Sequence, residues 1–172
     1  MTISMHSACV PVFTRLLGHL GQWLDKAEAH AAAKKFDASV YLGARLAPDM
    51  LPFIKQIQIG CDAAKFGIAR LSGVPAPKFE DTETSFTELR ERIRKTVDFI
   101  QSVPADAING TEDKDISVPR RDGAITLKGE WYLKHFVLPN FYFHMTTTYA
   151  LLRHNGVDLG KSDYLGVLTP AA

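Results

Sequence analysis

Residues 130–154 read EWYLKHFVLPNFYFHMTTTYALLRH, and this stretch says most about the fold class. Helical spacing gives it one inward face made of Phe141, Met145, Thr148 and Leu152. Phe136 and Phe143 then lie on the opposite side, where a helix on a monomer's surface is normally polar. Asn155-Gly156 supplies the residue expected just past a helix C-terminus. We therefore expect a helix that is apolar nearly all round, covered by the rest of the chain or by a second copy.

Three more segments repeat apolar residues at steps of three and four, which predicts helices over 2–33, 49–72 and 85–103. Pro11 should bend the first helix or delay its start. Pro48-Asp49 is a start signal for the second helix, and residues 37–47 predict a short helix or turn before it. Ser85 and Glu88 form a capping box at the start of the third.

Small residues make part of the 49–72 helix thin, at Gly60, Ala63, Ala64 and Gly67. Close packing against another helix and close approach of a ligand are both compatible with this pattern.

Residues 115–128 predict a two-stranded hairpin around the turn Arg120–Gly123, and it should be the only sheet. After the last helix, the tail should fold back and cover apolar surface with Val157, Leu159, Tyr164 and Leu165. These elements predict an all-α four-helix bundle with a hairpin insert before the last helix, built as one domain over residues 1–172.

Composition excludes several classes of protein. The 172 residues include 20 Lys and Arg against 19 Asp and Glu, a net charge of +1, so a nucleic-acid partner is not expected. Neither a membrane span nor a signal peptide is expected, which makes the cytoplasm the default compartment. Cys9 and Cys61 sit in apolar stretches, as buried reduced thiols do.

The residues alone identify no catalytic machinery. Leu159-Gly160-Lys161-Ser162 resembles the end of a phosphate-binding loop, but Asn155 stands where that loop needs glycine. His19 and His30 should be exposed, and neither has a partner at the spacing of a zinc site. Asn140 and His144 are four residues apart and share a stripe that borders the inward face of the last helix.

Four combined motifs resemble an uncharacterised bacterial family, a domain-of-unknown-function branch of the DinB/YfiT-like superfamily. They cover the segments 44–50 (ARLAPDM), 139–144 (PNFYFH), 151–156 (LLRHNG) and 160–166 (GKSDYLG). The resemblance implies a bundle of up-down-down-up topology, commonly paired as a homodimer. Superfamily relatives include metal-dependent transferases and isomerases that use a thiol cofactor. Their ion is held by one histidine of the second helix and two of an H-x-x-x-H run on the fourth.

Carried over residue by residue, this metal pattern mostly fails. The H-x-x-x-H pair falls on Asn140 and His144, and the 49–72 helix has no histidine. Its polar candidates are Gln56, Gln58, Cys61 and Asp62. Amide oxygens are poor ligands for zinc or nickel, so we expect a degenerate site with no metal and no cofactor.

The sequence predicts that the polar residues of the second and fourth helices meet between them. The candidate ligand-binding residues are Asn140, His144, Gln58, Cys61 and Asp62. They form either a pocket for a small molecule or a closed hydrogen-bonded network. The preferred interpretation is an uncharacterised DinB-like bundle that forms a homodimer through the last helix; its degenerate metal site is either available to a small molecule or closed by the network. The alternative is a thiol-dependent transferase or isomerase that uses His144 as base or a weakly held metal. Whether the protein is an enzyme stays open.

Overall fold

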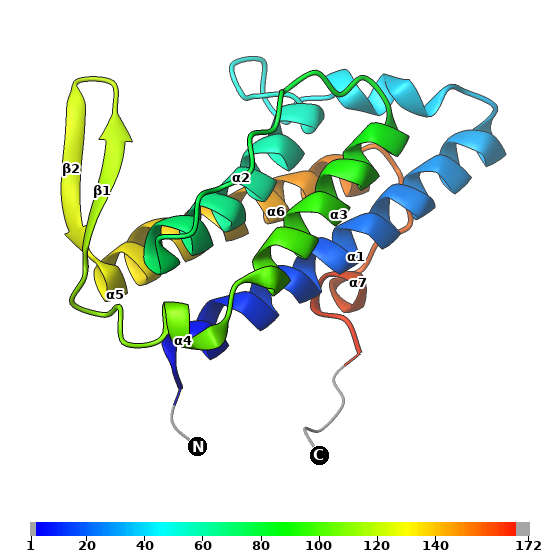
Figure 1. Ribbon diagram of the computed structural model, residues 1–172. Coiled ribbons are helices and arrows are strands. Elements are labelled where there is room, and N and C mark those ends of the chain that lie inside the picture. The colour runs from blue at the N-terminus through cyan, green and yellow to red at the C-terminus, as the bar shows by residue number, and fades with distance from the viewer. Residues whose placement is uncertain (1–2, 168–172) are drawn as a thin grey trace.

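The computed structural model describes residues 3–167 and shows a mostly helical chain with one two-stranded hairpin (Figure 1). The elements are, in chain order, α1 (Met5–Lys34), the 3₁₀ helix η1 (Ala38–Gly43), α2 (Phe53–Ser72), α3 (Phe86–Ser102), α4 (Ala105–Ile108), β1 (Asp115–Arg120), β2 (Gly123–Lys128), α5 (Gly129–Tyr132), the π-helical η2 (Leu133–Val137), α6 (Leu138–His154) and α7 (Lys161–Leu165). No helix in this part of the chain is both long and apolar enough to cross a membrane.

The long helices α1 and α2 each pack against both α3 and α6. Contacts along each pair give the helix directions. The Phe13 and Phe141 rings lie 4.8 Å apart and those of Trp23 and Tyr149 5.7 Å apart, so α1 and α6 run parallel. Arg90 of α3 reaches Glu28, and Asn109 after α4 reaches His6, so α1 and α3 run antiparallel.

The contacts of α2 give its direction in the same way. Phe53 packs on Phe86 near the start of both helices, so α2 and α3 run parallel. Gly60 lies against Met145 and Gly67 lies against Val137, so α2 and α6 run antiparallel. A Cβ added at either glycine would come within 2.5 Å of the opposing side chain. The thin part of α2 therefore serves close helix packing at these two positions.

Local signals explain where α1 begins and ends. Ser4 and Ser7 cap each other's backbone amides, which starts the helix at Met5. The predicted start at Thr2 lies outside the described residues, and Ile3 is exposed and precedes the helix. The helix passes continuously through Pro11, so a start delayed to that residue is wrong. Lys35 ends it in the left-handed conformation.

The predicted start of the second helix at Asp49 is also wrong, because α2 begins at Phe53. Pro52 disfavours helical geometry at the residue before it, and its own extended backbone occupies the N-cap position. Residues 38–43 form the short helix expected ahead of it. Gly73, with φ 83°, ends α2.

The third helix has the predicted N-cap, since Ser85 accepts from the Glu88 amide at 3.3 Å. The Glu88 carboxylate instead accepts from Thr84, so the capping box is only half formed.

The hairpin confirms the predicted insert, with Ile116 opposite Leu127 and Val118 opposite Ile125. It stands at one end of the molecule, beside α5 (Figure 1). Ile116 and Val118 are buried, which ties the sheet to the helices.

The predicted helix over 130–154 is helical throughout and runs from α5 through the π-helical η2 into α6 without a break. Pro139 has no amide hydrogen to donate to the preceding turn, and the chain forms a π-helical stretch just before it. After α6, Val157 and Leu159 are buried and Tyr164 stacks on Trp23, as predicted for the tail. Leu165 stays 44% exposed, contrary to the prediction.

Candidate functional site

The structure divides the five candidate residues among different neighbours. His144 packs on Gln56 of α2, whereas Gln58 and Cys61 face α3 and the linker before it. Asn140 and Asp62 line a pocket between α2 and α6. Successive residues of a helix are rotated by about 100°, so polar positions two apart on α2 must point to different neighbours. The predicted single cluster of all five residues is therefore wrong.

His144 is held in one tautomer by Gln56. The Gln56 amide nitrogen donates to the Leu51 carbonyl at 2.9 Å, which turns the amide oxygen toward His144 Nδ1 at 2.7 Å. Because that oxygen only accepts, Nδ1 carries the proton and Nε2 carries the lone pair. His144 is 7% exposed, and burial lowers the pKa of its imidazole. At neutral pH the ring is an uncharged hydrogen-bond acceptor at Nε2.

These residues do not fit the ion of the metal-dependent relatives. His144 is the one imidazole of the relatives' three that this chain keeps, because Asn140 stands in place of the second and α2 contains no histidine. Within residues 3–167, no three His, Cys, Asp or Glu side chains are grouped so that they could hold a metal ion. A stable zinc site needs about three protein ligands, mainly imidazole, thiolate or carboxylate.

Gln58 and Asp62 belong to a charged network centred on Arg92 of α3, and Cys61 lies beside it. The Arg92 guanidinium contacts Asp62, Asp81 and Glu83 at 2.9–3.0 Å, and its side chain is 1% exposed. Gln58 donates to the same Glu83 at 2.7 Å. Burial alone would lower the pKa of Arg92. The hydrogen bond to Glu83 and the charges of the nearby carboxylates outweigh this effect of burial, so the pKa is raised. Arg92 is buried, although Arg94 and Lys95, two and three residues along the same helix, are exposed.

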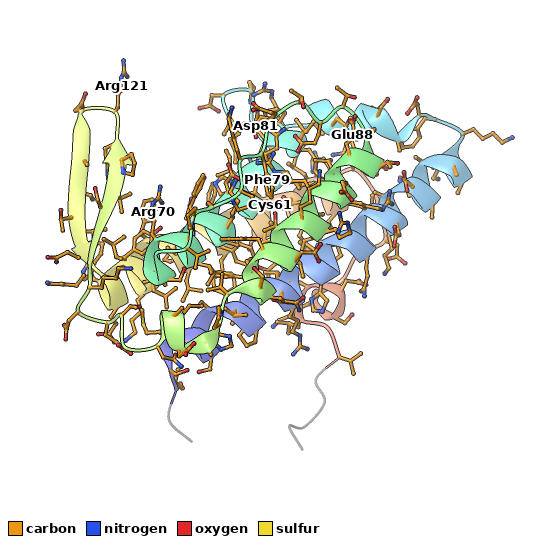
Figure 2. The ribbon with its side chains drawn as sticks, viewed as in Figure 1. Cys61, Arg70, Phe79, Asp81, Glu88 and Arg121 are labelled. Carbon is orange, nitrogen blue, oxygen red and sulfur yellow. The ribbon has the colours of Figure 1, made fainter. Side chains whose placement is uncertain are left out.

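Lys65 completes this network from α2. Its ammonium lies 2.8 Å from Asp62 and within 4.1–4.4 Å of the ring centres of Phe79 and Phe66. Phe79 belongs to the α2–α3 linker (Figure 2). The centre of its ring lies 4.1 Å from Lys65 Nζ and 5.3 Å from Arg92 Cζ. Aromatic faces and a carboxylate are the surroundings that let a cation be buried.

Cys61 is not an available nucleophile. It is fully buried beside this network, and burial raises the pKa of its thiol to about 12, against a smaller opposite effect of a hydrogen bond with Thr96. The thiol stays protonated at neutral pH, which argues for a structural role.

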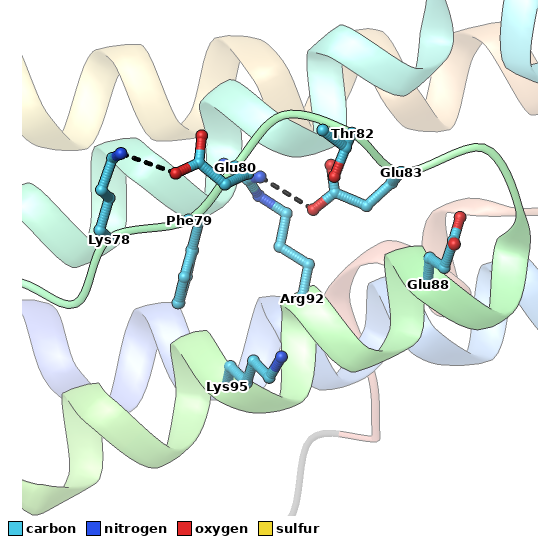
Figure 3. A pocket seen from close by; sticks show the side chains of 8 residues that line it. All are labelled: Lys78, Phe79, Glu80, Thr82, Glu83, Glu88, Arg92 and Lys95. Carbon is cyan, nitrogen blue, oxygen red and sulfur yellow. Dashed lines mark hydrogen bonds and ion pairs between the residues drawn. The ribbon is translucent and has the colours of Figure 1, made fainter.

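A pocket of about 360 Å³ opens between the linker and α3 (Figure 3). Four of its six charged side chains pair with one another, Lys78 with Glu80 at 2.7 Å and Arg92 with Glu83 at 2.9 Å. A ligand there would have to compete with these ion pairs.

A second pocket, of about 190 Å³, lies between α2 and the α5–α6 region, and we call it the α2–α6 pocket. Its lining residues are Ile59, Asp62, Ala63, Phe66, Arg70, Tyr132, Phe136, Val137 and Asn140. Apolar walls with a few polar groups are typical of small-molecule sites, and this volume suits a fragment-sized ligand. The pocket brings together two of the five predicted residues, Asp62 and Asn140.

Comparison with known proteins places the chain in a family. The family model described as "Domain of unknown function (DUF1993)" matches residues 5–165. The chain belongs to the DUF1993 family. This DUF1993 protein is also similar to a DinB family member protein from Shewanella denitrificans, whose crystal structure matches with 42% identity and a TM-score of 0.91. The match covers 97% of this chain and 94% of the other, which confirms the resemblance to the DinB-like superfamily. A comparison with the curated proteins found no match.

Several residues of the α2–α6 pocket and of the charged network in this DUF1993 protein were not predicted from the sequence. Arg70 and Tyr132 line the α2–α6 pocket, and Lys65 and Arg92 form the charged network. One signal was available for Lys65, because Asp62 and Lys65 are three residues apart on a helix and can pair. No sequence signal marks Tyr132 as a partner of Arg70, since 62 residues separate them.

Proposed function

We propose that this DUF1993 protein binds a small molecule in the α2–α6 pocket without a metal ion. The observation that carries the proposal is the composition of the pocket: Arg70, Asp62 and Asn140 converge on walls formed largely by apolar and aromatic side chains. The larger linker pocket is a weaker candidate because most of its charged side chains are already paired with one another.

The residues present support the view that the metal site of the relatives is degenerate. Asn140 stands at the other position of the H-x-x-x-H pattern beside His144, and α2 contains no histidine. Elemental analysis of protein purified without an affinity tag should find far less than one zinc or nickel per chain. About one metal per chain, lost in His144→Ala, would contradict the proposal.

A fragment screen by ligand-observed NMR tests the pocket itself. Ala63→Phe places a ring in the pocket, and Ala33→Phe places the same ring on the exposed side of α1 as a control. We expect fragments that bind the wild type and the control but not Ala63→Phe. Fragments that bind all three proteins equally, or no fragments at all, would refute the proposed site.

We also propose that the protein is a homodimer paired through the outer face of the α5–α6 region. Trp131, Tyr142 and Phe143 are 51%, 40% and 55% exposed, a large aromatic surface for a monomer of near-neutral charge. Phe136, expected in the same patch, is half-buried and stacks on Tyr132, so Phe143 is the better probe.

Light scattering should give about twice the chain mass of 19.1 kDa, and Phe143→Ser should shift the protein toward monomer. A wild-type monomer at tens of micromolar would refute this.

The helix directions support an up-down-down-up four-helix bundle that forms one domain over residues 1–172. The two free, buried cysteines support a reducing compartment such as the cytoplasm. The near-neutral charge argues against a nucleic-acid partner. The alternative of a thiol-dependent transferase or isomerase with His144 as base receives no support from the comparisons.

A further inference from the structure

Arg70 is the charged group that distinguishes the α2–α6 pocket. Its guanidinium carbon lies 5.1 Å from the centre of the Phe66 ring, and its Nη1 donates to the Tyr132 hydroxyl at 3.0 Å. Within residues 3–167, no carboxylate lies within 4.0 Å of it. Figure 2 shows Arg70 extending from α2 toward the hairpin end of the molecule. A half-buried arginine that lines a pocket without an acidic partner is available to an anion from outside.

Tyr132 fixes how Arg70 presents its donors. The tyrosine is buried, and burial raises the pKa of its hydroxyl, against a smaller opposite effect of Arg70, so the group is uncharged at neutral pH. It donates to the Phe66 carbonyl at 3.4 Å while it accepts from Arg70 Nη1. Within the described part of the chain, Arg70 Nε and Nη2 make no side-chain hydrogen bond. These two donors match the two oxygens of a carboxylate.

Asp62 also lines the pocket, but its charge is already compensated. Its Oδ1 accepts from Lys65 at 2.8 Å and from Arg92 at 3.0 Å. Two cations on one carboxylate weaken its attraction for a cationic ligand and its repulsion of an anionic one. Arg70 therefore sets the charge preference of the pocket.

Resting on the proposed function, we infer that the α2–α6 pocket takes a small organic monoanion, a carboxylate with an apolar body. The carboxylate binds the free edge of Arg70, which Tyr132 positions. The body lies against Ile59, Phe66 and Phe136, and the small volume excludes large ligands. No metal or cofactor takes part.

Isothermal titration with matched probe pairs tests the charge preference. The probes are butanoate, hexanoate, benzoate and phenylacetate, each compared with its neutral amide of nearly the same shape. At least one carboxylate should bind about tenfold or more tightly than its amide, as expected when a charge-assisted hydrogen bond is gained. Arg70→Met should remove that advantage, whereas Arg153→Met, a substitution at an exposed position of α6, should keep it.

Two further variants distinguish a specific loss of carboxylate binding from a loss of folding. Arg70→Lys keeps the charge and loses the paired donors, so it should bind between the wild type and Arg70→Met. Tyr132→Phe keeps Arg70 itself and frees Nη1, so affinity for the carboxylate should fall while that for the amide changes little. Thermal unfolding of each variant shows whether it is folded at the titration temperature.

The outcomes separate the inference from the proposed function. If amides bind as tightly as carboxylates, and Ala63→Phe abolishes both, the pocket binds small molecules but the anion preference is wrong. If no carboxylate binds while neutral or cationic fragments bind in an Ala63→Phe-sensitive way, the inference alone fails. If nothing binds the pocket, both fail.

Discussion

The two polar faces of α2 differ in how they are stabilised. The face toward α6 is uncharged: Gln56 bonds His144, and Gly60 and Gly67 allow the helices to approach. The face toward α3 and the linker is charged, with Asp62 and Lys65 packed around Arg92. One helix therefore supplies close packing on one side and compensated buried charge on the other.

This difference shows why polar residues close together in a helical sequence need not form one site. The uncharged face depends on shape, so it should be sensitive to added volume. The charged face depends on pairing, so it should be sensitive to the loss of one ion. Asp62 and Arg70 lie at the border between the faces and reach the α2–α6 pocket.

The largest expected effect is on the charged face. Arg92→Met leaves three carboxylates without their shared cation, and breaking a buried ion pair costs about 3–5 kcal/mol. Because the Asp62 and Asp81 side chains are 31% and 44% exposed and can reach water, we expect about 3 kcal/mol. Urea unfolding measures this loss.

Arg94→Met is the matched control for Arg92→Met. Arg94 lies on the same helix and pairs with Glu91 and Asp98, but its side chain is 59% exposed. Removing it should change the free energy of unfolding by no more than about 1 kcal/mol. Equal losses in the two variants would show that the Arg92 network is no more important than a surface pair.

The second prediction concerns the uncharged face. Gly67→Ala adds a Cβ only 2.5 Å from Val137 Cγ1, and overpacking of this kind costs about 1–3 kcal/mol. Gly18→Ala, on the exposed side of α1, meets nothing within 4 Å and should gain up to about 1 kcal/mol of helix propensity. Thermal unfolding should shift in opposite directions for the two variants. An upward shift for Gly67→Ala would mean that Val137 of η2 gives way to the added methyl group without loss of stability.

The sequence predicted the elements of the fold well because they depend on periodicity and local signals. The Ser85 cap and the Arg120–Gly123 turn required no knowledge of the neighbours. It failed where a stronger local constraint prevailed, as at Pro52, which delays the start of α2, and it did not foresee the π-helical stretch before Pro139.

The candidate site was predicted only in part because its contacts join distant segments. The sequence placed His144 toward the second helix but could not pair it with Gln56, which is 88 residues away. Arg92 has the same residue type as Arg94, whose side chain is 59% exposed, and only the fold of the linker buries it. Charge pairing across a linker has no periodicity from which it could be predicted.

The third prediction uses the lowered pKa of His144. At a pH between the two pKa values, the His144 side chain is protonated in the unfolded chain but neutral in the folded one. The contribution of His144 to stability is therefore fully present above about pH 6.5, and it is lost as the pH falls through the pKa of the folded state. Relative to His144→Gln, the wild type should therefore lose stability on acidification from pH 7.5. Uptake of one proton changes the slope of the unfolding free energy against pH by at most about 1.4 kcal/mol per pH unit. Identical pH profiles would show that His144 does not contribute in this way.

Nitrogen NMR provides a second measurement of the same pair. The wild-type imidazole should be the Nδ1-protonated tautomer, because Gln56 offers only an oxygen to Nδ1. Gln56→Leu removes that acceptor and should allow the Nε2-protonated form. A wild type that is already Nε2-protonated would mean that Gln56 does not orient the ring.

The smallest expected effect lies at the rim of the charged network, and it separates exposed pairs from buried ones. Lys55 and Asp81 are 3.2 Å apart, and their side chains are 38% and 44% exposed. Partial burial alone would raise the pKa of Asp81, but the hydrogen bond with Lys55 and the charge of Arg92 together outweigh it, so the pKa is lowered. A double-mutant cycle with Lys55→Met and Asp81→Asn should give a coupling below about 1 kcal/mol that falls further at high salt. The same cycle with Lys65→Met and Asp62→Asn should give a larger, salt-insensitive coupling, because Lys65 is 2% exposed. Two couplings of equal size would mean that the linker exposes the network to water far more than the structure indicates.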